Sequence, residues 1–158
     1  MPYNFRGKFF SMFSLIYKSI ARKDLAHKDI KDMMQKASCY NSQNAITGCL
    51  VYHNRCFIHL LEGNEKLVRR LFGKISKDER HGDIVLLNLE ENTFPLFSNF
   101  STVYNDFEDV KDQVRHKRML FHQVFHGADI VKSPGGSKLT LWTQVNNLLK
   151  MENRLSYG

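Results

Sequence analysis

Residues 45–63, AITGCLVYHNRCFIHLLEG, decide the fold, because they contain two apolar runs with a short polar connection between them. The runs span 45–52 and 55–62 and are apolar on both faces, which is typical of strands in the centre of a covered sheet. His53-Asn54 joins them and is short enough for a hairpin turn. The stretch therefore predicts a β-hairpin in the middle of a sheet.

Hydrophobic periodicity on either side of the hairpin predicts three further strands and two helices. The strands are expected over 12–20, 83–89 and 98–104, and the helices over 27–40 and 65–77, of which Asn64 caps the second. The order β-α-β-β-α-β-β predicts an α+β, ferredoxin-like fold. Its five-stranded mixed sheet carries both helices on one face.

Tyr17 and His59 stand on the first and third strands, which are adjacent in a ferredoxin-like sheet. Neighbouring strands lie about 4.8 Å apart, so these two side chains are candidates for contact. His59 shares one face of its strand with Phe57 and Leu61. A buried imidazole is tolerated when it has a hydrogen-bond partner, so the pattern alone leaves both a core role and a functional role open.

Residues 106–158 follow a different pattern, which predicts a C-terminal helical extension of two helices. A helical stripe runs through 107–126, SPGGSK at 133–138 is a loop, and 139–151 form a second amphipathic helix. We therefore predict a domain over 1–105 and a helical extension over 106–158.

Composition narrows the class of protein. The chain has 158 residues, 42% hydrophobic and 25% charged, which suits a globular domain. It has no apolar run long enough to span a membrane and no signal-peptide cleavage site, so we expect a cytoplasmic protein without membrane contact. The three cysteines form no CxxC pair, which argues against a disulfide framework and a zinc site.

The net charge of +7 includes the basic run 115–118. Such a run could meet an anionic partner, but no nucleic-acid recognition motif accompanies it, so we do not expect nucleic-acid binding. His122 and His126 are four residues apart without an evident third ligand, which argues against a metal site. The sequence contains no recognisable nucleophile, base and orienting group in a catalytic pattern, so we do not expect an enzyme.

Several short motifs follow one another on the predicted elements. They are Tyr17-x-Ser19, Asn41, Ile46-Thr47-Gly48, Phe57-x-His59-x-Leu61-Glu62-Gly63 and Asp78-Glu79-Arg80-His81. In this order and spacing the sequence resembles the BLUF family, the sensors of blue light using FAD, over residues 12 to 104. The tail is also similar to that of short BLUF proteins, which assemble into homo-oligomers.

The resemblance implies that FAD binds with its isoalloxazine ring between the two helices. Tyr17 and His59 would be the photoactive pair, with Tyr17 in the place of the tyrosine that donates an electron and a proton. Asn41 would hydrogen-bond the polar edge of the ring. The other cofactor-binding positions would be Ser19, Tyr40, Lys74, Asp78, Arg80 and His81. The tail helices would signal to a downstream partner protein.

Three residues depart from the family pattern. His59 stands where the family has a glutamine, and Phe100 and Thr102 replace the tryptophan and methionine of a Trp-Ser-Met segment. A neutral imidazole has one donor and one acceptor on opposite sides of its ring, so it can bridge Tyr17 and a flavin but cannot rearrange as an amide does.

Besides the flavin sensor, two other hypotheses therefore stay open. One is a degenerate BLUF-like interaction module, with an impaired photocycle or without flavin. The other is a small enzyme on the same topology, of the acylphosphatase type. Residues 21–26 contain basic groups that could serve such an enzyme but no glycine-rich phosphate loop.

Overall fold

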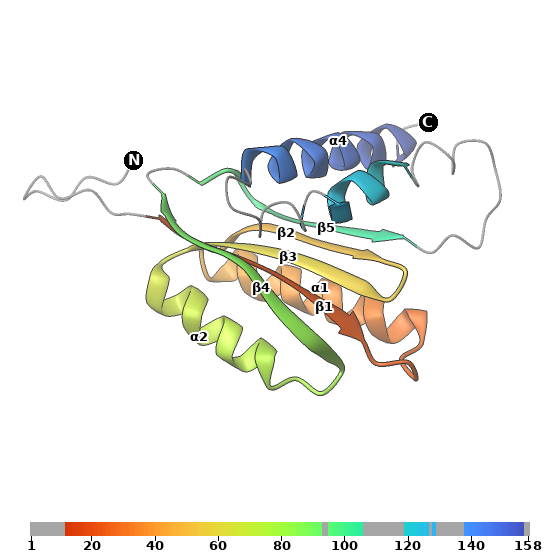
Figure 1. Ribbon diagram of the computed structural model, residues 1–158, viewed down its shortest axis with the longest axis horizontal. Helices are drawn as coiled ribbons and strands as arrows, with labels where there is room; N and C mark the ends of the chain where they lie inside the picture. Colours follow the sequence, from red (N-terminus) through yellow and green to blue (C-terminus); the bar gives the residue numbers. More distant parts are fainter. Residues whose placement is uncertain (1–11, 93–94, 106–118, 127, 129–137, 157–158) are drawn as a thin grey trace, which may run out of the picture.

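Five strands form one mixed sheet in the order β4-β1-β3-β2-β5, and helices cover both of its faces (Figure 1). The structure is a computed structural model that describes residues 12–92, 95–105, 119–126, 128 and 138–156. Its strands are β1 (Met12–Ala21), β2 (Thr47–His53), β3 (Cys56–Gly63), β4 (His81–Asn92) and β5 (Phe100–Asn105). Its helices are α1 (His27–Gln43), α2 (Glu65–Ser76) and α4 (Lys138–Ser156), and a further helical segment covers 119–126.

The strand register places the candidate side chains in one row. β1 pairs antiparallel with β3 and β4, and β2 pairs antiparallel with β3 and parallel with β5. Tyr17 lies opposite His59, and His59 lies opposite Leu50. Residues opposite one another in a ladder project from the same face of the sheet. This register confirms that the first and third strands are neighbours and that Tyr17 and His59 share a face.

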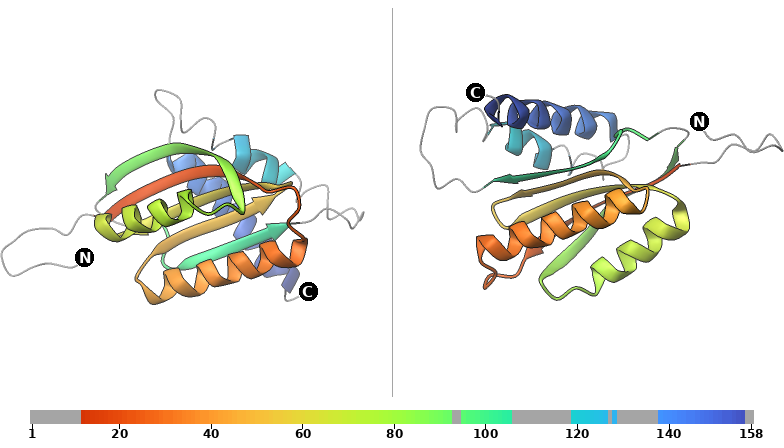
Figure 2. Two further views of the ribbon diagram at one scale, coloured as in Figure 1. Left: turned by 90° about the horizontal axis from the view of Figure 1, so that it is seen from below. Right: turned by 180° about the vertical axis from the view of Figure 1, so that it is seen from behind.

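The sheet separates two hydrophobic cores. Figure 2 shows α1 and α2 on one face, and α4 with the segment 119–126 on the other. The core under α1 and α2 includes Leu15, Ile30, Met34, Leu61 and Val68. The core under α4 includes Ile16, Val51, Ile58, Phe121, Leu141, Val145 and Leu148. No helix in the described ranges is both long and apolar enough to cross a membrane.

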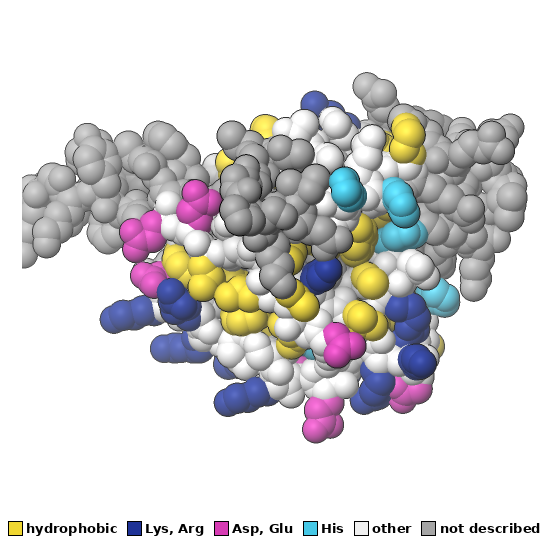
Figure 3. Space-filling view, in the orientation of Figure 1, with side chains coloured by type: hydrophobic (Ala, Val, Ile, Leu, Met, Phe, Trp, Pro, Cys, Tyr) yellow, Lys and Arg dark blue, Asp and Glu magenta, His cyan; other side chains and the backbone are white. Residues whose placement is uncertain are grey.

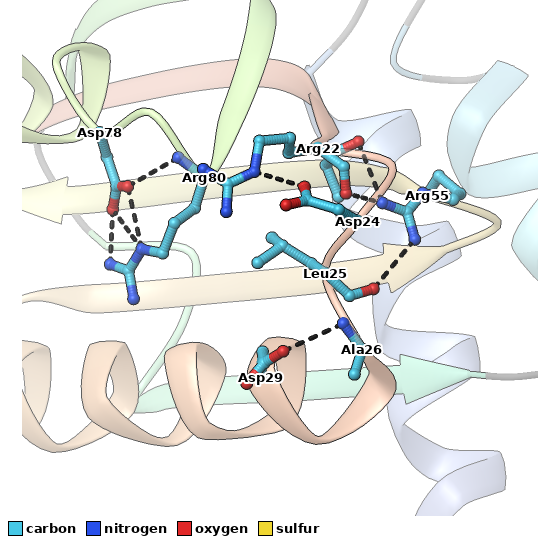
Figure 4. Close-up of polar contacts among 9 residues, drawn as sticks. Arg22, Asp24, Leu25, Ala26, Asp29, Arg55, Asp78 and Arg80 are labelled. Carbon is cyan, nitrogen blue, oxygen red and sulfur yellow. Dashed lines mark hydrogen bonds and ion pairs between the residues drawn. The ribbon is translucent and has the colours of Figure 1, made fainter.

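Local chemistry explains where the elements begin and turn. The side chain of Asn64 accepts a hydrogen bond from the Leu67 amide at 3.3 Å, which confirms the predicted N-cap of α2. The β2–β3 turn has positive φ at Asn54 and Arg55, as in the type I′ turns that suit hairpins. The Arg55 guanidinium also donates to the Leu25, Ala21 and Arg22 carbonyls, so it fastens the hairpin to the β1–α1 connection (Figure 4).

A buried carboxylate ties β3 to the loop before β5. Glu62 accepts from the Thr47 hydroxyl at 2.9 Å and from the Leu96 and Phe97 amides at 2.7 and 3.1 Å. The indole N–H of Trp142 in α4 donates to the Leu96 carbonyl at 2.7 Å. The same loop is therefore held by β3 on one side and by the C-terminal helix on the other.

The predicted α+β, ferredoxin-like fold is confirmed, including the five-stranded mixed sheet and both helices on one face. One detail is wrong by a residue: the turn is Asn54-Arg55 rather than His53-Asn54, because His53 still pairs with Cys56 as the last residue of β2. The greater part of the helix predicted over 107–126, the basic run 115–118 and most of the loop 133–138 lie outside the described residues. The division into a domain and an extension stays a prediction.

Candidate functional site

A cavity of about 260 Å³ lies between α1 and α2, against the helix-covered face of the sheet. Its walls are mostly apolar, and polar groups come from the floor and from the segment after α2. The lining residues include Met33, Met34, Ala37, Leu50, Phe57, Leu71 and Ile75 among the apolar ones, and Tyr17, Lys36, Tyr40, Asn41, His59, Asp78, Arg80 and His81 among the others. A flat, largely apolar ligand with one polar edge would suit these surroundings.

Tyr17 and His59 form the floor of the cavity. Both side chains are only 3% exposed, and the Tyr17 hydroxyl lies 2.8 Å from Nδ1 of His59. Burial, and then the charge of Asp78, raise the pKa of Tyr17, so the phenol keeps its proton. We infer that it donates to Nδ1, because this arrangement leaves no phenol hydrogen unused. The remaining ring hydrogen of neutral His59 is then on Nε2.

Three buried polar atoms around the cavity lack a hydrogen-bond partner among the residues that the structure describes. They are Nε2 of His59 and both side-chain atoms, Oδ1 and Nδ2, of Asn41. The backbone carbonyl of Asn41 accepts from the Ile46 amide at 3.0 Å, which fixes the end of α1 against the start of β2. An unsatisfied buried polar group costs about 1–3 kcal/mol, so these atoms point to a ligand with its own donors and acceptors.

His81, at the start of β4, is held by two hydrogen bonds. Its Nε2 donates to the Ile75 carbonyl at 2.7 Å, and its Nδ1, also at 2.7 Å, accepts from the Ser19 hydroxyl. We assign this tautomer because a carbonyl can only accept. Ser19 thus contacts the cavity through His81 and does not line it.

Asp78 and Arg80 form an ion pair at the end of the cavity, where several of their side-chain atoms meet (Figure 4). The hydrogen bonds from Arg80 lower the pKa of Asp78, so this carboxylate stays charged near the Tyr17 phenol. Phe100 lies on the other side of the floor, with its ring edge-on to His59 at 5.6 Å between centroids. Thr102 is exposed and pairs with Leu50, which lines the cavity.

The structure brings most of the predicted site residues together. Seven of them line the cavity: Tyr17, Tyr40, Asn41, His59, Asp78, Arg80 and His81. Lys74 does not line it but is exposed on the flank of α2, one turn from the lining residue Leu71, and a binding role for it stays a prediction. Sequence reasoning placed Met33, Met34 and Ala37 only in a core stripe, and it missed Lys36, for which the sequence has no distinguishing signal.

The stability of the chain should depend on pH through His59. Burial, and to a smaller extent the charge of His81, lower the pKa of His59 to about 3. The unfolded chain takes up this proton near pH 6.5, whereas the folded chain excludes it, so stability falls as the pH decreases from about 6.5 towards 3. Between pH 7 and pH 5, this one group should remove about 2 kcal/mol of stability.

Urea unfolding of the wild type and of a His59→Gln variant at both pH values checks this expectation. The two proteins differ only at position 59, so contributions from the rest of the chain cancel in the difference. The wild type should lose about 2 kcal/mol more than the variant between pH 7 and pH 5. Equal losses in the two proteins would mean that His59 is charged or solvated in the folded chain.

The fold and the cavity define an α+β domain with a mostly apolar cavity between two helices. The family model described as "BLUF: Sensors of blue-light using FAD" matches residues 12–103, which is more than half of the chain. The chain therefore belongs to the BLUF family.

Two curated relatives illustrate the range of this family. The blue light- and temperature-regulated antirepressor BluF of Escherichia coli (strain K12) is 39% identical over 74 residues, which cover 47% of this chain and 18% of that protein. The photoactivated adenylate cyclase subunit beta of Euglena longa is 34% identical over 85 residues, which cover 52% of this chain and 10% of that protein. The chain thus spans less than a fifth of the length of these relatives.

Solved structures match over more of the chain. BlsA in its photo-activated state has 26% sequence identity and a TM-score of 0.62, covering 87% of this chain and 94% of that one. The dark-state structure of the BLUF protein BlrB has a TM-score of 0.64 at 23% identity, covering 87% and 97%. At that identity the likeness to BlrB concerns the fold alone.

Proposed function

We propose that this chain binds FAD in the cavity between α1 and α2 and acts as a blue-light sensor. The observation that carries the proposal is the group of three partnerless polar atoms on Asn41 and His59, which border a mostly apolar cavity. A flavin ring has carbonyl and nitrogen groups along one side and an apolar opposite side, so it can satisfy these atoms. Membership of the BLUF family supports the same ligand.

The residues present fit such a ring. The Asn41 amide offers one acceptor and two donor hydrogens, and His59 offers Nε2. The cavity of about 260 Å³ is slightly smaller than most ligand pockets, which measure roughly 300–1,000 Å³, so it suits a ring system better than a whole dinucleotide. The phosphates would then lie outside, with Lys36 and Arg80 as the cations on the lining.

The remaining predicted positions differ in how directly they could contact the ligand. Tyr40 and Asp78 line the cavity, and Ser19 would act by orienting His81. Lys74 is exposed on α2 outside the lining, so only an outer part of the ligand could reach it. Its role in binding stays a prediction.

Tyr17 and His59 would carry the photochemistry. FAD, when bound, supplies the absorption of blue light and an excited state that accepts an electron. Tyr17 would give up that electron, and its phenol proton would pass to Nδ1 of His59, 2.8 Å away. The imidazole could pass the hydrogen on Nε2 to the bound ring that took the electron, so His59 would act as a proton relay and end as the opposite tautomer. This relay takes the place of the amide rearrangement that glutamine allows.

The signal would leave the domain through the C-terminal helix. Glu62 is three residues from His59 on β3 and holds the Leu96 and Phe97 amides, while Trp142 of α4 holds the Leu96 carbonyl. A shift of β3 would therefore move Leu96 and Phe97, and through Leu96 it would reach Trp142 of α4. We propose that this shift changes how the tail meets a downstream signalling protein.

We also propose that the protein is cytoplasmic, works as a homo-oligomer and catalyses no reaction. The three cysteines are free thiols, which agrees with a reducing compartment. Leu86 and Leu89 are exposed on the edge strand β4, opposite Tyr17 and Leu15, and give its α1/α2 side an apolar surface that a second copy could cover. The match covers only 10% of the photoactivated adenylate cyclase subunit of Euglena longa, so the activity of that protein does not carry over to this chain.

Absorbance spectra in the dark and under blue light test the proposal, on the protein as purified and after refolding with FAD. The wild type is expected to be yellow, with tightly held flavin. A His59→Gln variant should also bind flavin and show a reversible red shift under blue light. The same substitution at the exposed His122 of the segment 119–126 is the control, and its spectra should match those of the wild type.

A second candidate function is a BLUF-like interaction module without flavin. The replacement of the family's glutamine, tryptophan and methionine by His59, Phe100 and Thr102 favours it, because all three changes fall in the row and strand beside the cavity. A preparation that stays colourless after refolding with FAD would contradict the sensor proposal and support this module.

A further inference from the structure

Helix α2 has two faces with different tasks. Leu71 and Ile75 on its inner face line the cavity, and Val68 is buried in the core. The outer face carries the exposed cations Lys66 and Arg70 and is extended by the C-cap residue Lys77; we name these three residues the α2 basic face. Figure 3 shows Lys and Arg side chains projecting from the molecule in the region where Figure 1 draws α2.

The geometry of the helix places these cations in one row. Lys66, Arg70 and Lys77 are separated by four and seven residues, so they stand on the same side at 3.6 residues per turn. From Lys66 to Lys77 the row extends over about 17 Å. A row of this kind presents its charges to a single partner surface.

No ion pair between described residues neutralises the row. Glu65 and Asp78, the carboxylates at the two ends of the helix, are paired with Arg69 and Arg80 instead. Another ion pair, between Arg22 and Asp24, lies away from this helix. The α2 basic face therefore keeps its charge for a molecule outside the chain.

Gly73 is an unexpected residue on the same side of α2 as the cations. It lies in the middle of α2 on the exposed side, and a Cβ at this position would meet nothing within 4 Å. Glycine destabilises a helix interior more than any residue except proline, and nothing within the described fold requires it here. A flat strip of backbone between cations instead allows another chain to approach closely.

We propose that the α2 basic face, centred on Gly73, is a docking surface for an acidic helix of a partner protein. Carboxylates at helical spacing would match the cation row, and the bare backbone at Gly73 would let the two helices pack side by side. Leu71 and Ile75 on the inner face of the same helix line the cavity, so docking would be sensitive to what the cavity contains. The surface itself does not need a flavin.

Other anionic partners fit less well. A membrane-binding helix needs an apolar face free for lipid, whereas the apolar side of α2 is packed against the sheet. Nucleic-acid phosphates are reached by long Lys and Arg side chains, which gain nothing from a glycine between them. The outer face of α2 also has no aromatic side chain on which the bases of a single strand could stack.

Fluorescence anisotropy of a labelled helical peptide tests the docking surface on the full chain. The probe carries Glu at positions i, i+4, i+7 and i+11, and its control is the same composition in scrambled order. The triple variant Lys66→Glu, Arg70→Glu, Lys77→Glu should weaken binding at least about tenfold, because like charges then oppose each other. The variant Lys23→Glu, Lys28→Glu, Lys150→Glu changes the net charge equally at exposed sites elsewhere and should bind as the wild type does.

Gly73→Gln separates docking from simple attraction between opposite charges. It leaves every charge in place and should raise the thermal midpoint of unfolding. It should nevertheless weaken binding of the peptide with Glu at i, i+4, i+7 and i+11 by about fivefold or more, because the glutamine side chain blocks close approach of the two helices. Equal binding of the ordered and scrambled peptides, or no effect of Gly73→Gln, would overturn the proposal. Tighter binding of a short DNA duplex than of the peptide would also overturn it in favour of a nucleic-acid partner. Flavin content, measured on the same samples, reports separately on the cavity.

Discussion

A Gly48→Ala variant is expected to lose at least about 3 kcal/mol of stability, which for a domain of ordinary stability removes most of the folded population. Gly48 has a φ of +132°, a conformation that side-chain-bearing residues rarely adopt. A Cβ there would lie 2.0 Å from the Leu60 carbonyl oxygen of the neighbouring strand. Because the obstacle is backbone, β2 and β3 would have to move apart. Urea unfolding monitored by circular dichroism measures the loss.

Gly73→Ala is the matched control for this variant. It makes the same chemical change in α2, where a Cβ meets nothing within 4 Å and the φ is not positive. It should stabilise the chain by roughly 0.5–1 kcal/mol. A Gly48→Ala protein as stable as the wild type would show that β2 and β3 do not approach as closely as the structure has them.

An Asn41→Leu variant is expected to bind flavin about 100-fold more weakly while the flavin-free chain becomes more stable. Loss of two hydrogen bonds to a ligand, at about 1–1.5 kcal/mol each, corresponds to roughly 30- to 150-fold in affinity. Without ligand, however, both polar atoms of the Asn41 side chain are buried and partnerless, so an apolar residue of similar shape relieves a cost of about 1–3 kcal/mol. Flavin fluorescence titration and urea unfolding measure the two effects.

The opposite signs of these two effects separate a binding role from a structural one. Asn147→Leu makes the same change at an exposed position of α4 and should leave flavin affinity unaltered. If Asn41→Leu lowered stability and affinity together, the amide would have partners within the folded chain, and its assignment to the ligand would be wrong.

The sequence predicted the order of the elements because each has a clear hydrophobic period. It also predicted the contact between Tyr17 and His59, since the topology makes their strands neighbours and the period-2 pattern sets their faces. The predicted position of the hairpin turn is wrong by one residue, because Arg55 takes part in the turn with a positive φ, which arginine seldom adopts. No local pattern reports such a conformation.

The contacts that the sequence could not reveal join residues far apart in the chain. Glu62 belongs to a recognisable motif, but its bonds to the Leu96 and Phe97 amides depend on how the β4–β5 loop folds back. The partnerless state of Asn41 and His59 likewise appears only when all neighbouring donors and acceptors are placed. Lys74 was expected at the ligand only from the family resemblance; it is exposed on α2 and does not line the cavity, so its role in binding stays a prediction.

The most direct test is a crystal structure of this chain with FAD. The account predicts the isoalloxazine ring between α1 and α2, with the Asn41 amide and Nε2 of His59 about 2.7–3.2 Å from heteroatoms of the ring. Tyr17 should retain its hydrogen bond to Nδ1 of His59. Flavin bound elsewhere, or a cavity closed by protein side chains with both groups turned away, would contradict it.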